Sequence, residues 1–142
     1  MFTAAGMAQH QADAESLMTL ALLAEEPGPR GAPDLATMTQ ATPWTSKGTS
    51  IGKVQSIGRQ PQGREVNVGG VTRTVMEGGL HLPVGAYVDE VEGLLIRPGW
   101  RFTVTAVGPA DDVALLRQRY LVVEVLRKSR MTARRLDVVE VA

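Results

Sequence analysis

The stretch REVNVGGVTRTV at Arg64–Val75 decides the fold class of this chain. Two runs rich in Val and Thr flank Gly69-Gly70. Such a glycine pair predicts an antiparallel hairpin, because glycine accepts the positive φ of a type I′ turn. The cross-strand pairs on one face are then Val68 with Val71, Val66 with Arg73, and Arg64 with Val75. The other face is wholly polar and consists of Glu65, Asn67, Thr72 and Thr74. This pattern is typical of a half-exposed hairpin.

Further β-prone runs, separated by Gly or Pro, surround this hairpin. The candidate strands are Ile51–Ile57, Tyr87–Val91, Arg101–Val107, Tyr120–Leu126 and Ala133–Val141. We expect Gly78-Gly79 to interrupt the chain between strands, and Val113–Arg117 to form a helical turn. Many short strands with Gly/Pro turns and no alternating helices predict a mainly β protein. The expected fold is a small antiparallel β-barrel or sandwich with a short N-terminal helix and a protruding hairpin.

The first 50 residues have a different character. Residues 5–18 contain good helix formers and predict a short helix with a thin apolar stripe. Thr19–Glu25 could continue this helix or begin a strand. The Pro/Gly-rich run Glu25–Pro33 predicts a loop, and residues 34–49 predict irregular or partly extended chain. We therefore divide the chain into a helix with an extended arm (1–50) and a β-barrel domain (51–142).

Composition limits the possible chemistry. The 142 residues are 44% hydrophobic, only 4% are aromatic, and there is no cysteine, which excludes disulfides and thiolate chemistry. No apolar stretch is long enough to span a bilayer, and no signal-peptide pattern is found at the start. We expect a protein of the cytosol or of the interior of a virion. The longest apolar run, Leu17–Ala24, is far too short for a membrane helix.

No residue pattern indicates catalysis, a metal or a cofactor. The only histidines, His10 and His81, lie far apart, and there is no nucleophile motif or phosphate loop. We expect Asp111-Asp112 to form a turn and helix cap. The acidic cluster of Asp89, Glu90 and Glu92 is typical of a solvated face. The sequence therefore predicts a protein that is not an enzyme, although an enzyme remains the weakest alternative.

Charge is balanced over the whole chain but not along it. Lys and Arg number 15, as do Asp and Glu, yet Met1–Glu26 is acidic and Arg97–Asp137 is basic. The candidate site residues are basic and lie around the hairpin and the last turn; they are Arg59, Arg64, Arg73, Lys128, Arg130, Arg134 and Arg135. They form either ordinary solubilising surface or contacts with a neighbouring subunit or a phosphate backbone. We expect Trp44 and Trp100 to be packing or interface anchors, and His81 to face solvent or a neighbouring subunit.

Several short motifs carry a family resemblance through their order along the chain. They are AESLMT at Ala14–Thr19, GKVQ at Gly52–Gln55, RxVxVGG at Arg64–Gly70, LHLP at Leu80–Pro83, RPGWRFTVT at Arg97–Thr105, a loop with Asp112, Leu115 and Arg119, and TARRL at Thr132–Leu136. In this order they resemble the small neck proteins of siphophages that infect actinobacteria. Those proteins are called head-to-tail stopper, head closure or head–tail connector proteins.

The resemblance implies a virion protein, assembled in the host cytoplasm, that forms a homo-oligomeric ring. Such a ring lies between the portal–adaptor complex and the tail terminator or tail tube, extends the DNA channel, and retains packaged DNA without reading its sequence. No cofactor and no membrane contact are implied. The hairpin at Arg64–Val75 is the candidate for an element that projects into the channel or onto a neighbouring ring. The alternatives are a tail terminator, a mostly helical adaptor, or a β-barrel module that binds nucleic acid.

Overall fold

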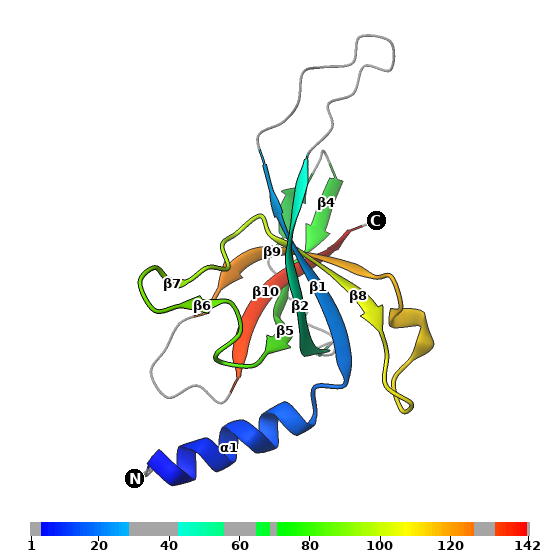
Figure 1. Ribbon diagram of the computed structural model, residues 1–142. Helices are drawn as coiled ribbons and strands as arrows, with labels where there is room; N and C mark the ends of the chain where they lie inside the picture. Colours follow the sequence, from blue (N-terminus) through cyan, green and yellow to red (C-terminus); the bar gives the residue numbers. More distant parts are fainter. Residues whose placement is uncertain (1–3, 29–42, 56–64, 69–70, 127–132, 142) are drawn as a thin grey trace.

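A computed structural model describes residues 4–28, 43–55, 65–68, 71–126 and 133–141. Within these ranges the protein is mainly β and is built around a closed antiparallel barrel (Figure 1). In their order around the barrel, the six strands are β1 (Leu20–Pro27), β2 (Trp44–Val54), β5 (Met76–Leu82), β10 (Arg134–Val141), β9 (Arg119–Val125) and β8 (Arg101–Ala106). Pairing of β8 with β1 closes the barrel. The expected fold class is confirmed.

Alternating residues of these strands fill the barrel. On β1, Leu20, Leu22 and Ala24 are buried while the residues between them are partly exposed. The largest fully buried side chains include Leu22, Phe102, Leu80, Leu82 and Leu136. Burial of each such side chain contributes about 1.5–3 kcal/mol. With so few aromatic residues available, aliphatic side chains supply most of this core.

The barrel includes strands that we expected in the arm. β1 and the whole of β2 belong to it, so the expected boundary at residue 51 does not separate the barrel from the preceding chain. Thr19–Glu25 does not continue the helix; its alternation places every second residue in the core, and β1 continues to Pro27. Residues 34–49 are expected to be irregular or partly extended, and from Trp44 onward the chain is extended, because β2 begins there and pairs with β1. Residues 29–42 lie outside the described residues.

Gly78-Gly79 does not interrupt the chain between strands. β5 continues through both glycines, with Gly78 in the left-handed region at φ +60°. The register of β10 against β5 shifts between Leu136 and Val138, so Glu77, Gly78 and Gly79 lie opposite the single residue Asp137 and form a bulge in β5. A Cβ at Gly79 would lie 2.7 Å from the Cβ of Met76, so the close turn of the backbone requires glycine there. The glycines therefore allow a bend within the strand.

The hairpin around Gly69-Gly70 forms a separate two-stranded sheet, β3 (Glu65–Val68) and β4 (Val71–Thr74). Its register is the expected one, with Val68 opposite Val71 and Val66 opposite Arg73. Arg64 and the two glycines themselves are not among the described residues. A second small hairpin consists of β6 (Val88–Asp89) and β7 (Gly93–Leu94), so the strand expected at Tyr87–Val91 is much shorter than predicted.

One α-helix, α1 (Ala4–Ser16), precedes the barrel and extends away from it (Figure 1). A single turn of 3₁₀ helix, η1 (Val113–Leu115), lies between β8 and β9, where a helical turn was expected. Within the described residues, no helix has the length and apolar character needed to cross a membrane. Met18, two residues after the end of α1, is buried where the chain leads into β1.

Candidate functional site

The seven basic residues expected at the site do not form one cluster in the described part of the chain. Arg59, Arg64, Lys128 and Arg130 lie outside the described residues. The other three are Arg73 on β4 and the neighbouring residues Arg134 and Arg135 on β10. Each of these three has a different environment.

Arg73 and Arg134 bind backbone carbonyls of this chain. Arg73 Nη1 donates to the Glu140 carbonyl oxygen at 2.8 Å, which attaches hairpin β3–β4 to the last barrel strand. Arg134 Nη2 donates to the Val84 carbonyl oxygen at 3.4 Å. Both side chains are partly buried, and both therefore have an internal structural role. Of these three described arginines, only Arg135 is exposed and available to a partner.

Arg135 belongs to a line of three cationic or titratable side chains on the outer face of the barrel. His81 on β5 pairs directly with Lys53 on β2 and with Arg135 on β10. All three point outward, because the residues that alternate with them, such as Gly52, Leu80 and Leu136, are buried. Directly opposed residues have Cβ atoms only about 4.5–5.5 Å apart. We call Lys53, His81 and Arg135 the cationic row.

The environment of His81 disfavours its protonated form. Partial burial lowers the pKa of His81, and the positive charges of Lys53 and Arg135 lower it further. A hydrogen bond from His81 Nε2 to the Gly78 carbonyl oxygen, 2.8 Å long, raises the pKa; this effect is smaller than that of burial or of Lys53 and larger than that of Arg135. His81 is half-buried, so it faces the outer surface without being fully solvated. Sequence alone gave no sign that the row exists, because its members are 28 and 54 residues apart.

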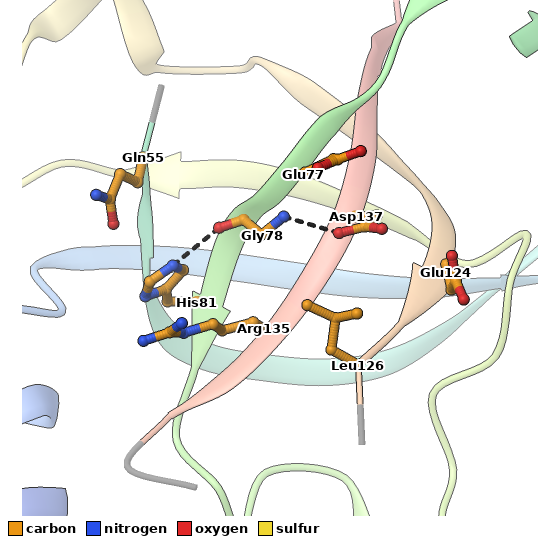
Figure 2. A pocket seen from close by; sticks show the side chains of 8 residues that line it. All are labelled: Gln55, Glu77, Gly78, His81, Glu124, Leu126, Arg135 and Asp137. Atoms are coloured by element: carbon orange, nitrogen blue, oxygen red, sulfur yellow. Dashed lines mark hydrogen bonds between the residues drawn. The ribbon is translucent and has the colours of Figure 1, made fainter. Parts of the chain in front are cut away.

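An open pocket of about 450 Å³ lies beside the row on the outer face of β5, β10 and β9. Figure 2 shows His81 and Arg135 on one side of this pocket and Glu77, Asp137 and Glu124 on the other. Asp137 lies directly opposite Glu124 on β9. Only 5% of Asp137 is exposed, and its Oδ1 accepts a hydrogen bond from the Gly78 N–H at 2.8 Å. The face therefore has a cationic side and an acidic side.

An exposed acidic feature lies at the tip of hairpin β6–β7. We call Asp89, Glu90, Val91 and Glu92 the acidic tip; all four are exposed, and Val91 is 92% exposed. Asp89 Oδ1 accepts from the Val91 N–H at 3.1 Å, which orders the turn. The exposure expected for this acidic cluster is confirmed.

The base of the same hairpin is fixed to the barrel. The Leu95 N–H donates to the Tyr87 carbonyl oxygen at 2.8 Å. The Tyr87 ring makes edge contacts with Trp100 at 5.8 Å and Phe102 at 6.0 Å between ring centroids. Burial raises the pKa of the Tyr87 hydroxyl. The acidic tip is thus carried by a hairpin whose base packs on the core.

The remaining candidates have structural roles. Asp112 caps η1 by accepting from the Ala114 N–H at 2.9 Å, and Asp111 Oδ2 accepts from the Thr19 hydroxyl at 2.6 Å, as expected for a turn and cap. Trp100 is buried in the core, while the Arg101 guanidinium lies 4.0 Å from the centroid of the Trp44 ring. Among the described residues, no group of three His, Cys, Asp or Glu is arranged to hold a metal ion.

The fold and these surfaces define a small closed β-barrel protein with a charged outer face and a projecting acidic hairpin. The chain belongs to the family described as "Family of unknown function (DUF6093)", whose model matches residues 10–139. Comparison with curated proteins and with solved structures gives no match to either.

Proposed function

We propose that this protein is a structural ring subunit of the neck of a tailed bacteriophage, of the head-to-tail stopper or head closure type. The ring lies between the portal–adaptor complex and the tail, continues the DNA channel, and retains packaged DNA. In this role the chain has no catalytic residue and needs no cofactor. It is a virion component that assembles in the host cytoplasm.

One observation carries this proposal: a closed barrel that presents oppositely charged features on different elements. Closing the sheet removes its edges, so copies cannot associate by adding strand to strand across the barrel. Contacts between copies must then use side-chain surfaces and projecting elements. The acidic tip on β6–β7 and the cationic row on β2, β5 and β10 are two such surfaces. A ring of identical subunits requires two different complementary surfaces on each copy.

The environment of the arginines also supports an assembly role over a nucleic-acid-binding module. A groove that binds a phosphate backbone needs several available cations along one path. In the described ranges, Arg73 and Arg134 bind carbonyl oxygens of this chain, and Arg101 pairs with Glu25 at 2.9 Å. The order of sequence motifs, which resembles the phage neck proteins, supports the same choice.

Within the ring we assign hairpin β3–β4 to the channel or to the neighbouring ring. It lies outside the barrel (Figure 1). Its polar face includes Glu65, Asn67, Thr72 and Thr74, which are all exposed. Deletion of Glu65–Thr74 should abolish DNA-filled, tail-competent particles while leaving the barrel folded. Normal particle yield from the deleted chain would contradict this assignment.

The test of the proposed function is deletion of the gene from the phage or prophage that encodes it. We expect unjoined heads and free tails under negative-stain imaging, with joined particles restored when the wild-type gene is supplied on a plasmid. Infectious particles of normal morphology without the gene would overturn the proposal. The position of the gene, between those for the major capsid and tail tube proteins, is the matching genomic expectation.

A further inference from the structure

We propose that the acidic tip of one copy docks on the cationic row of a second copy, and that this head-to-tail contact closes the ring. The inference rests on the proposed function, and it names the partner surface on each side. The occupant of the row is a second copy of this same chain, held through the carboxylates of Asp89, Glu90 and Glu92.

The row needs an anionic partner. Lys53 and Arg135 lie on the strands on either side of His81, whose protonated form is disfavoured, and neither cation forms a salt bridge with any described residue. Elsewhere on the barrel cations do have acids beside them, as where Lys47 meets Glu26 at 2.9 Å. An incoming carboxylate would therefore meet two cations that have no salt bridge of their own within the described residues.

The acidic tip has the complementary properties. Its three carboxylates are exposed, and no described cation forms a salt bridge with them. The tip also has an apolar residue, since Val91 is 92% exposed at the turn. An apolar side chain held at the centre of three acids fits a surface that combines cations with an apolar contact.

The row has such an apolar neighbour at one end. Ile51 lies two residues before Lys53 on β2, faces outward, and is 46% exposed. At the other end, the acidic side of the pocket, with Glu77 and Glu124, repels an acidic partner. The docked tip is therefore restricted to the Lys53 end, where Val91 contacts Ile51 and the carboxylates reach the cations.

The contact is heterologous, because tip and row are different surfaces of the chain. Head-to-tail contacts of this kind produce rings when the rotation closes, whereas an isologous contact stops at a dimer. Exposed ion pairs each contribute little and are screened by salt. A single docked tip is therefore weak, and a closed ring gains from many such contacts at once.

The first test is a charge-swap complementation of the full-length chain, followed by sedimentation velocity at low salt. Glu90→Lys/Glu92→Lys reverses the tip, and Lys53→Glu/Arg135→Glu reverses the row. Each double variant alone should self-associate at least about tenfold more weakly than wild type. An equimolar mixture should associate again, because each tip then meets a row of opposite charge. Arg97→Glu/Arg119→Glu changes two exposed arginines outside both surfaces and should associate as wild type does.

The second test uses the absence of native cysteine. Chains carrying Val91→Cys and Ile51→Cys are mixed and oxidised; a disulfide-linked heterodimer is expected. Val113→Cys, at a residue that is 71% exposed, replaces Val91→Cys as the control and should not cross-link. The docking is overturned if the mixed charge variants fail to associate, or if wild type stays monomeric and the Val91/Ile51 pair does not cross-link. If gene deletion still yields unjoined heads and tails, the ring role stands and only this contact is wrong.

Discussion

Substitution of Gly52 by alanine tests the closure of the barrel. Gly52 is buried on β2, beside the ladder to β5, in which Lys53–His81 and Val54–Leu80 are the pairs among the described residues. An added Cβ would contact Leu22 Cδ1 too closely, and it would lie 2.9 Å from the His81 carbonyl oxygen. The leucine methyl can rotate away, but the carbonyl oxygen can move only if β5 moves away from β2.

The expected cost follows from this geometry. Overpacking in a filled core costs about 1–3 kcal/mol. Replacing glycine by alanine also reduces the conformational entropy of the unfolded chain, which offsets about 0.4–1 kcal/mol of this overpacking cost. Gly52→Ala should therefore lower the free energy of unfolding by about 1–2 kcal/mol and the Tm by roughly 3–8 °C for a chain of this size.

The assay is urea unfolding followed by far-UV circular dichroism and by fluorescence of the buried Trp100. Gly85→Ala is the matched control, because a Cβ there meets nothing within 4 Å. This control should be neutral or slightly stabilising. Equal stability of Gly52→Ala and the wild type would refute the close approach of β2 to β5 and, with it, this account of how the barrel closes.

Three further predictions concern the outer face and the hairpin. Asp137→Ala should lower the free energy of unfolding by about 1–3 kcal/mol, because it leaves the Gly78 N–H without its carboxylate acceptor; an unchanged urea midpoint would contradict this. Burial lowers the pKa of His81 from its usual 6.5, so the unfolded chain binds the proton more readily than the folded chain does. The stability that neutral His81 contributes is therefore fully present above pH 6.5 and is lost as the pH falls below it. When the pH is lowered from about 7.5 to 5.5, the free energy of unfolding, measured by urea titration, should fall less for His81→Gln than for the wild type. Equal decreases in the two proteins would contradict this effect of His81. Arg73→Ala should speed amide hydrogen exchange in β3–β4 but not in β8, because it removes the hydrogen bond to the Glu140 carbonyl oxygen. If β3–β4 exchanged at the same rate in the variant and the wild type, Arg73 would not attach the hairpin to the barrel.

The strands that sequence predicted best are those with a clear alternation or a clear turn. Arg101–Val107 and Tyr120–Leu126 match β8 and β9 to within a residue at each end, and the hairpin register follows from Gly69-Gly70 alone. For β1 the sequence does not distinguish the two structures, because LALLA suits a helix as well as a strand; pairing with β2 and β8 on both sides favours the strand. Local propensity could not reveal those partners.

The site was less predictable than the fold. The sequence predicts a site from arginines that lie near one another along the chain. Arg73 and Arg134 instead donate hydrogen bonds to backbone carbonyl oxygens that only folding brings within reach. The cationic row depends on the register of three strands from distant parts of the chain, and one of those strands, β5, was itself expected to be interrupted at Gly78-Gly79. The acidic tip was visible in the sequence, but its exposed Val91 and its fixed base were not.

Electron microscopy can show whether this chain forms a ring on the adaptor. The full-length chain should be co-expressed with the portal and adaptor proteins of the same genome, purified through a tag on the adaptor, and examined by negative-stain microscopy. We expect a closed ring of this chain as an extra layer on the adaptor, with an open channel along its axis. Portal–adaptor particles that never acquire this layer, while the chain remains soluble and monomeric in the same preparation, would contradict it.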